Sequence, residues 1–373
     1  IVAMLVGEGR VELDAVVRTY VPEFVLSDEH AAATITVRHL LTHTSGFDGD
    51  IWPDHGEGDD AIRRLTEGLS EVEQLTEPGV RFSYNNAGYA VLGRLIERVL
   101  DAPFESVLRD RIAVPSGAEI TSDVRRILPR RFAVGHVSGE SGPAPVATVV
   151  GPACLAPAGS RTWATVDDLL AFGELHLGRH ADTDLHRALV TMRSRQVDVA
   201  DPNNGGTMGL GVFLDDRWGT PVVFHDGGVN GQAAYLRVLP EDDAVLVVMT
   251  TGGVPQAFHR HALRLMAARL GRDAPRAAVA DPSVSIDPAR YVGRYAASAT
   301  VVDIERDGDT LVATITWGPG TAEPLVRGSL RLAAVDDRVF LTPLDGRDYV
   351  FVFPPSDEPC DHLLAGLRLL RRQ

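Results

Sequence analysis

Apolar residues recur at helical spacing in one long segment that follows a polar turn. Leu92, Leu95, Ile96 and Val99 lie three or four positions apart within residues 87–100. Side chains with this spacing share one face of an α-helix. The segment is therefore predicted to be an amphipathic helix that packs against a core. Shorter helical patterns are found at residues 1–7, 38–43, 60–75, 165–172 and 257–270.

Strand patterns dominate a later part of the chain. Residues 222–224, 233–239 and 244–250 are rich in β-branched and aromatic side chains, and Gly-rich or acidic turns at 226–231 and 240–243 join them. Runs of this length and spacing are typical of an antiparallel meander.

The character of the sequence changes after a stretch of small residues that contains Pro275 and Pro282. This stretch, residues 272–287, is interpreted as a linker. Short alternating runs separated by Gly/Asp turns follow it, which predicts a small all-β module at 288–373. Residues 1–271 would then form the larger domain, in line with a length of 373 residues.

Composition narrows the classes of partner. The chain is 45% hydrophobic and 23% charged, which is ordinary for a globular protein, and its net charge of −15 argues against nucleic acid or an anionic membrane as a partner. No apolar run reaches the ~18 residues that a membrane span needs. Cys154 and Cys360 are too few for a disulfide framework, which leaves a single bridge between them open.

All 36 basic residues other than histidine are arginines, so no lysine of this chain can act as a general base or form a Schiff base. His39 and His43 have the i, i+4 spacing of some metal sites, but no third ligand is evident, and local packing explains them better. No phosphate-binding loop, dinucleotide fingerprint or Cys/His metal spacing is found. We expect neither a cofactor nor a metal.

Tyr84 and Asn86 are the first candidate site residues, at the start of the predicted long helix. A tyrosine next to a cation can take a proton from an attacking alcohol and return it to a leaving group. An asparagine can orient a substrate carbonyl. Taken alone, these residues are better explained as a half-buried aromatic followed by a helix cap.

His225, Gly227 and Gly228 are the second candidates, after a predicted strand. A glycine without a Cβ would let substrate lie along the strand edge, and the Gly228 N–H could contribute to an oxyanion hole. Taken alone, the Asp-Gly dipeptide favours a simple hairpin turn.

Five segments together resemble the serine β-lactamase-related superfamily, which includes class C β-lactamases, D-alanyl-D-alanine carboxypeptidases, D-aminopeptidases and related esterases. The resemblance covers roughly residues 1–270, and the all-β module is similar to the small β-barrel often appended in this family. The matching segments are residues 2–14, ITVRHLLTHTSG at 35–46, FSYNNAGYAVLG at 82–93, PAGSRTWATVDDLLAF at 157–172, and HDGG with PED within 225–242.

The resemblance implies an α/β sandwich, in which helices flank an antiparallel sheet and the site lies between the sheet edge and a helical subdomain. The family's Tyr-x-Asn motif falls on Tyr84 and Asn86, and its Lys/His-x-Gly motif on His225 and Gly227. Tyr84 would assist proton transfer, Asn86 would orient substrate, and His225 would replace an ammonium group. The implied activity is hydrolysis of an amide or ester through an acyl-enzyme, peptidase- or esterase-like rather than that of a true β-lactamase.

The family nucleophile and its partner lie in Ser-x-x-Lys, which a chain without lysine cannot contain. We expect this motif about ten residues before Ile1, within three turns of the same helix, so that residues 1–373 alone would be inactive. The competing hypothesis is an inactive, ligand-binding or regulatory homologue. A peptide or small molecule is the expected partner, while oligomeric state and a cytoplasmic or secreted bacterial location stay open.

Overall fold

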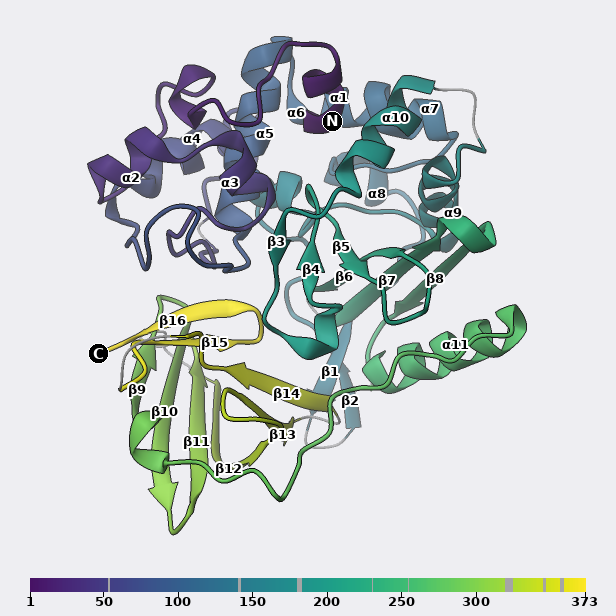
Figure 1. Ribbon diagram of the computed structural model, residues 1–373. Coiled ribbons are helices and arrows are strands. Elements are labelled where there is room, and N and C mark those ends of the chain that lie inside the picture. The colour runs from purple at the N-terminus through teal and green to yellow at the C-terminus, as the bar shows by residue number, and fades with distance from the viewer. Residues whose placement is uncertain are drawn as a thin grey trace.

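The computed structural model describes the chain except for residues 53, 140–141, 180–182, 230, 254, 319–324, 345–346 and 356–358. A helical region, an antiparallel sheet and a β-barrel make up the described residues (Figure 1). The α-helices are α1 (Val2–Gly7), α2 (Glu29–Thr34), α3 (Val37–Leu41), α4 (Ala61–Glu67), α5 (Asn86–Leu100), α6 (Phe104–Leu108), α7 (Val114–Ser116), α8 (Val124–Ile127), α9 (Val166–His176), α10 (Thr183–Met192) and α11 (Pro255–Leu270).

The long amphipathic helix is confirmed as α5. Leu92, Leu95 and Ile96 are buried as the spacing predicted, and Val99 is partly buried at the edge of the same core. That core fills the space among α3, α4, α5 and α6. The Asn85 side chain caps the start of α5 by accepting the Gly88 N–H at 2.6 Å, so the residues just before the helix are firmly placed.

The predicted antiparallel meander is confirmed, and the sheet contains three strands in addition to the three that were predicted. All neighbouring strands are antiparallel and follow one another in chain order. The strands of this sheet are β3 (Val197–Asp198), β4 (Thr207–Met208), β5 (Phe213–Asp215), β6 (Val222–Val229), β7 (Gln232–Leu239) and β8 (Ala244–Thr250), and a separate hairpin is formed by β1 (His136–Gly139) and β2 (Gly142–Pro145).

Side chains alternate between the two faces of this sheet, as strand geometry requires. Val223 and Val238 pack with Phe172 of α9 on one face, while Val222 and Leu239 pack with α11 on the other. His225 lies two positions after Val223 and opposite Leu236 of β7. It therefore belongs to the face turned toward α9 rather than α11.

The C-terminal module is a closed eight-stranded barrel, which confirms the all-β prediction. β16 pairs with both β15 and β9, and the second pairing closes the barrel. The domain limits proposed at 272–287 stay a prediction, although no α-helix or strand lies between α11 and β9. The barrel strands are β9 (Gly293–Ala296), β10 (Thr300–Asp307), β11 (Thr310–Trp317), β12 (Leu325–Ala334), β13 (Val339–Leu344), β14 (Arg347–Val352), β15 (His362–Ala365) and β16 (Arg368–Arg372).

Figure 1 shows β15 and β16 on the side of the barrel that is turned toward the helical region. Cys154 is buried in the helical core and Cys360 in the barrel core, and no disulfide joins them. Within the described residues, no helix combines the length and the apolar character needed to cross a membrane.

Candidate active site

Tyr84 and His225 meet in a cleft of about 880 Å³. The Tyr84 hydroxyl lies 3.3 Å from Nε2 of His225. Asn86, Gly227 and Gly228 line the same cleft. The structure thus brings together the two motifs that the sequence singled out, although 141 positions separate Tyr84 from His225.

Asn85 and Asn86 have different roles at the start of α5: Asn85 caps the helix, and Asn86 lines the cleft. Asn85 is buried and caps the helix, and its Nδ2 donates to Phe47 O at 2.9 Å and to Ser45 Oγ at 3.2 Å. The helix-cap interpretation therefore holds for Asn85. Asn86 is the first residue of α5 and lines the cleft, where its Nδ2 donates to Oδ1 of Asp50 at 3.1 Å.

Burial sets the protonation of the Tyr84–His225 pair. It raises the pKa of Tyr84 above its usual value, an effect that the Arg368 cation opposes and the Asp50 carboxylate reinforces. It lowers the pKa of His225, which the neighbouring Asp226 carboxylate opposes. At neutral pH the phenol is therefore protonated and the imidazole neutral, so the Tyr84 O–H can donate to Nε2 of His225.

The prediction of a turn over residues 226–231 is wrong in its extent, because the strand β6 continues through His225 to Val229. Gly227 pairs with Ala234 and Gly228 with Ala233, and Val229 stands opposite Gln232 at the end of the hairpin. In sequence, residues 230–231 are an Asn-Gly dipeptide of the kind preferred in two-residue hairpins, and residue 230 lies outside the described residues. His225 and both glycines therefore form the strand wall of the cleft.

The His43 ring packs against the Tyr84 ring. His43 is buried, its Nδ1 accepts the Asn85 N–H at 3.0 Å, and its ring lies between those of Tyr84 and Tyr89, with centroid distances of 4.1 and 4.8 Å. Burial, followed by repulsion from His225 when it is protonated and from the Arg368 cation, holds the pKa of His43 well below the usual value. A neutral His43 therefore fixes the backbone and the ring of the Tyr84–Asn85 segment.

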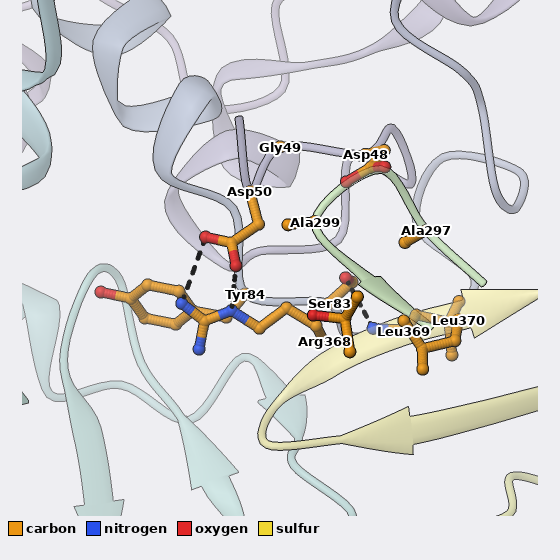
Figure 2. A pocket seen from close by; sticks show the side chains of 11 residues that line it. Asp48, Gly49, Asp50, Ser83, Tyr84, Ala297, Ala299, Arg368, Leu369 and Leu370 are labelled. Carbon is orange, nitrogen blue, oxygen red and sulfur yellow. Dashed lines mark hydrogen bonds and ion pairs between the residues drawn. The ribbon is translucent and has the colours of Figure 1, made fainter. Parts of the chain in front are cut away.

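Asp50 and Arg368 are two cleft residues that the sequence did not reveal. Arg368 begins β16 of the barrel, and its guanidinium lies 4.9 Å from the centre of the Tyr84 ring. Its Nε is 3.3 Å from Oδ2 of Asp50. Figure 2 shows the Arg368 guanidinium against the Tyr84 ring and joined to Asp50 by dashed lines. Nothing local in the sequence marks either residue, because 318 positions separate them.

His39 makes the local contacts that were expected, whereas His43 lies two residues beyond the end of α3 and contacts residues far along the chain. His39 accepts the Thr36 N–H at its Nδ1 and completes a capping box at the start of α3, whereas His43 is bound to Asn85. Among the residues that the structure describes, no three His, Cys, Asp or Glu side chains gather closely enough to hold a metal ion.

The chain is similar to several known proteins over most of its length. Penicillin-binding protein 4 of Amycolatopsis lactamdurans is 34% identical over 301 residues, which cover 78% of this chain and 77% of the relative. Two crystal structures of SurE, one of them with D-Leu, superpose with TM-scores of 0.77 and 0.73 at 24% and 25% identity, covering 100% of this chain and 84% of theirs. The octameric penicillin-binding protein homologue of Pyrococcus abyssi has a TM-score of 0.60 at 21% identity and covers 99% of this chain and 84% of its own.

The family model described as Beta-lactamase matches residues 1–270, which hold the helical region and the six-stranded sheet. The match includes Tyr84, Asn86 and His225, and it ends where α11 ends. Together with the 34% identity to a penicillin-binding protein over three quarters of both chains, this match shows that the chain belongs to the beta-lactamase family.

Proposed function

We propose that Tyr84, Asn86 and His225 form one wall of a site that hydrolyses an amide or ester through an acyl-enzyme. The observation that carries the proposal is the 3.3 Å contact between the Tyr84 hydroxyl and His225 Nε2 inside a cleft of about 880 Å³. A cleft of this size holds a peptide-like or drug-sized substrate. A histidine in place of the ammonium group supports a peptidase- or esterase-like activity rather than that of a β-lactamase.

The serine nucleophile and its lysine partner belong, in this proposal, to a Ser-x-x-Lys segment outside residues 1–373, because these residues contain no lysine. The serine oxygen attacks the substrate carbonyl carbon, and the lysine and Tyr84 pass its proton to the leaving amine or alcohol. A backbone N–H, with Gly228 as a candidate, stabilises the oxyanion. Water then cleaves the acyl-enzyme and restores the serine.

The substrate class that we propose has a D-configured residue next to the scissile bond. The support is the SurE structure with D-Leu, which is 25% identical to this chain over all of this chain and 84% of the SurE chain. The exposed Gly227 leaves open space at the strand edge, since the nearest atom to a Cβ built there is the Ala234 carbonyl oxygen at 3.9 Å. A substrate backbone can approach that edge closely.

A second candidate function is ligand binding without catalysis. The absence of lysine favours it, and so does the burial that raises the pKa of Tyr84, because a phenol with a raised pKa is a poor base. In this case the cleft would bind the same peptide-like ligands without acylation.

The deciding experiment compares the natural gene product with residues 1–373 alone. We expect the gene product to hydrolyse D-aminoacyl esters and anilides faster than the L-forms and faster than a chromogenic β-lactam. We expect Tyr84→Phe to lower its kcat by about 100-fold. Tyr20→Phe is the matched control, since the Tyr20 hydroxyl accepts the Glu12 N–H far from the cleft.

Residues 1–373 alone should form no adduct with a fluorophosphonate or penicillin probe by intact-protein mass spectrometry. A stoichiometric adduct on this chain would show that the nucleophile lies within it. A gene product that binds D-aminoacyl peptides but neither acylates nor hydrolyses them would establish the second candidate function.

A further inference from the structure

The turn between β15 and β16 of the barrel forms part of the cleft wall. Gly366, Leu367 and Arg368 line the cleft together with Tyr84 and His225. The barrel lies beyond the region that the family model matches, which ends at residue 270. A module appended to the family domain thus contributes directly to the proposed active site.

Backbone hydrogen bonds join this turn to the Tyr84 segment. The Tyr84 N–H donates to Leu367 O at 2.8 Å, and the Leu369 N–H donates to Ser83 Oγ at 3.1 Å. Leu367 has a φ of 70°, a left-handed conformation that costs a non-glycine residue free energy and persists only where surrounding contacts enforce it. The strained residue is the one whose carbonyl holds Tyr84.

Side chains extend this connection to Asn86. Both Asp50 oxygens face Arg368, with Oδ2 3.3 Å from Nε and Oδ1 3.4 Å from Nη2. The same Oδ1 accepts the Asn86 Nδ2 hydrogen at 3.1 Å. Figure 2 shows Asp50 joined to the Arg368 guanidinium, which lies against the Tyr84 ring. One carboxylate therefore links the barrel arginine to the asparagine at the start of α5.

We propose that Asp50 and Arg368 are a positioning pair, which orients the Asn86 amide and the Tyr84 ring across the junction between the family domain and the barrel. With Nδ2 held by Asp50, the Oδ1 of Asn86 is the atom that accepts a hydrogen bond from substrate or from the catalytic amine. The guanidinium holds the Tyr84 ring by a cation–π contact. This inference rests on the proposed function, since it presumes that Tyr84 and Asn86 act on substrate.

A different role for Arg368 would be to bind a substrate carboxylate. The contacts favour positioning, because the Asp50 carboxylate already occupies the guanidinium and the side chains of Arg368 and Asp50 are only 31% and 19% exposed. The two roles separate in kinetics. Loss of positioning lowers kcat, whereas loss of a substrate anchor raises KM for substrates that bear the carboxylate.

The test uses Arg368→Ala, Asp50→Ala, Asp50→Asn and the double Ala variant in the natural gene product. Arg371→Ala is the matched control, because Arg371 lies on the same strand and also forms an ion pair across the junction, with Glu73, but does not line the cleft. Two readouts are measured: kcat and KM with a D-aminoacyl ester, and the ¹⁵N side-chain amide signal of Asn86 by NMR.

We expect each single Ala substitution to lower kcat by about 10- to 100-fold with KM within about twofold, because small misplacements of catalytic groups are costly. The double variant should lose no more than the worse single one, as expected for residues that act as a unit. Asp50→Asn keeps an acceptor oxygen for Asn86 and should retain more activity than Asp50→Ala. The Asn86 signal should shift in the Asp50 and Arg368 variants and stay in place in Arg371→Ala.

The inference is overturned if kcat stays within twofold in all variants, if only KM rises, or if Arg371→Ala loses as much activity as Arg368→Ala. If the gene product turns over no acyl substrate, the proposed function fails. The Asn86 signal still decides the positioning in that case: a shift in Arg368→Ala and Asp50→Ala alone upholds it, and an unchanged signal refutes it.

Discussion

The imidazole of His43 lies against the ring of Tyr84, with centroids 4.1 Å apart and planes tilted by 30°. His43 is buried, and its Nδ1 accepts the N–H of Asn85, the residue that caps α5. One side chain thus supports both the proposed proton-transfer residue and the start of the helix that follows it.

His43→Ala should destabilise the protein by about 2–4 kcal/mol, because it leaves a cavity and a buried N–H without its acceptor. Chemical unfolding of both proteins measures this difference. His30→Ala is the control, since His30 is exposed on α2 and should change the unfolding free energy by less than about 0.5 kcal/mol. Equal changes in the unfolding free energy for His43→Ala and His30→Ala would show that the contacts of His43 do not stabilise the fold more than those of an exposed histidine.

The free energy of unfolding should depend on pH through His259. Burial, followed by the charge of Arg237, lowers the pKa of His259 from 6.5 to about 4 in the folded protein, where its ring stacks on Tyr235. Between pH 6.5 and 4 the unfolded chain therefore binds a proton that the folded chain does not. Stability should fall as pH drops through this window, by up to about 1.4 kcal/mol per pH unit from this group, and should not depend on it above pH 6.5.

Urea unfolding across pH 5.0–7.5 checks the slope. His259→Phe keeps the aromatic contact and removes the titrating group, so its profile should be flatter than that of the wild type. His261→Phe, at an exposed position of the same helix, should leave the slope unchanged. Identical slopes in all three proteins would assign the pH dependence to other groups.

Gly49→Ala should destabilise the protein by about 1–3 kcal/mol. A Cβ at this position would lie 1.7 Å from Oδ1 of Asn85, and would push that side chain off the Gly88 N–H that it caps. Gly7→Ala is the control, because Gly7 ends α1 with no atom near its added Cβ. Comparison of the two midpoints in thermal unfolding tests the idea, and an unchanged midpoint in Gly49→Ala would contradict it.

Gly227→Ala, in contrast to Gly49→Ala, should change activity but leave stability nearly unaltered. The added methyl group meets nothing closer than 3.9 Å, so stability should change by less than about 0.5 kcal/mol. The methyl group would occupy the strand edge where substrate is proposed to lie, and we expect kcat/KM of the natural gene product to fall by tenfold or more. An active enzyme with an unaltered kcat/KM would place the substrate elsewhere in the cleft.

The sequence predicted elements whose signals are local. The 3.6-residue spacing of Leu92, Leu95 and Ile96 gave α5 to within one residue of its start. The strand β6 was predicted too short, because Asp226, Gly227 and Gly228 lack the β-branched side chains by which strands are usually detected, and strand pairing overrode that preference.

The site was predictable only in part, because sequence patterns report local structure and not contacts between distant residues. Tyr84, Asn86 and His225 stand in short motifs and could be named, but their shared geometry could not be deduced from spacing. Asp50 lies in an acidic loop and Arg368 in a β-module 318 positions away. Their meeting depends on how the barrel docks, and docking is a property of the folded surface rather than of any local pattern.

The hydrogen bond between Ser83 and Leu369 joins residues 286 positions apart in the chain. Closing a loop of this length carries an entropic cost, which grows only slowly with the number of residues enclosed. The core around α5 lies within the helical region, whereas the cleft wall also includes β16, the strand that pairs with β9 and closes the barrel. The surroundings of Tyr84 are therefore complete only when the last strand of the barrel is in place.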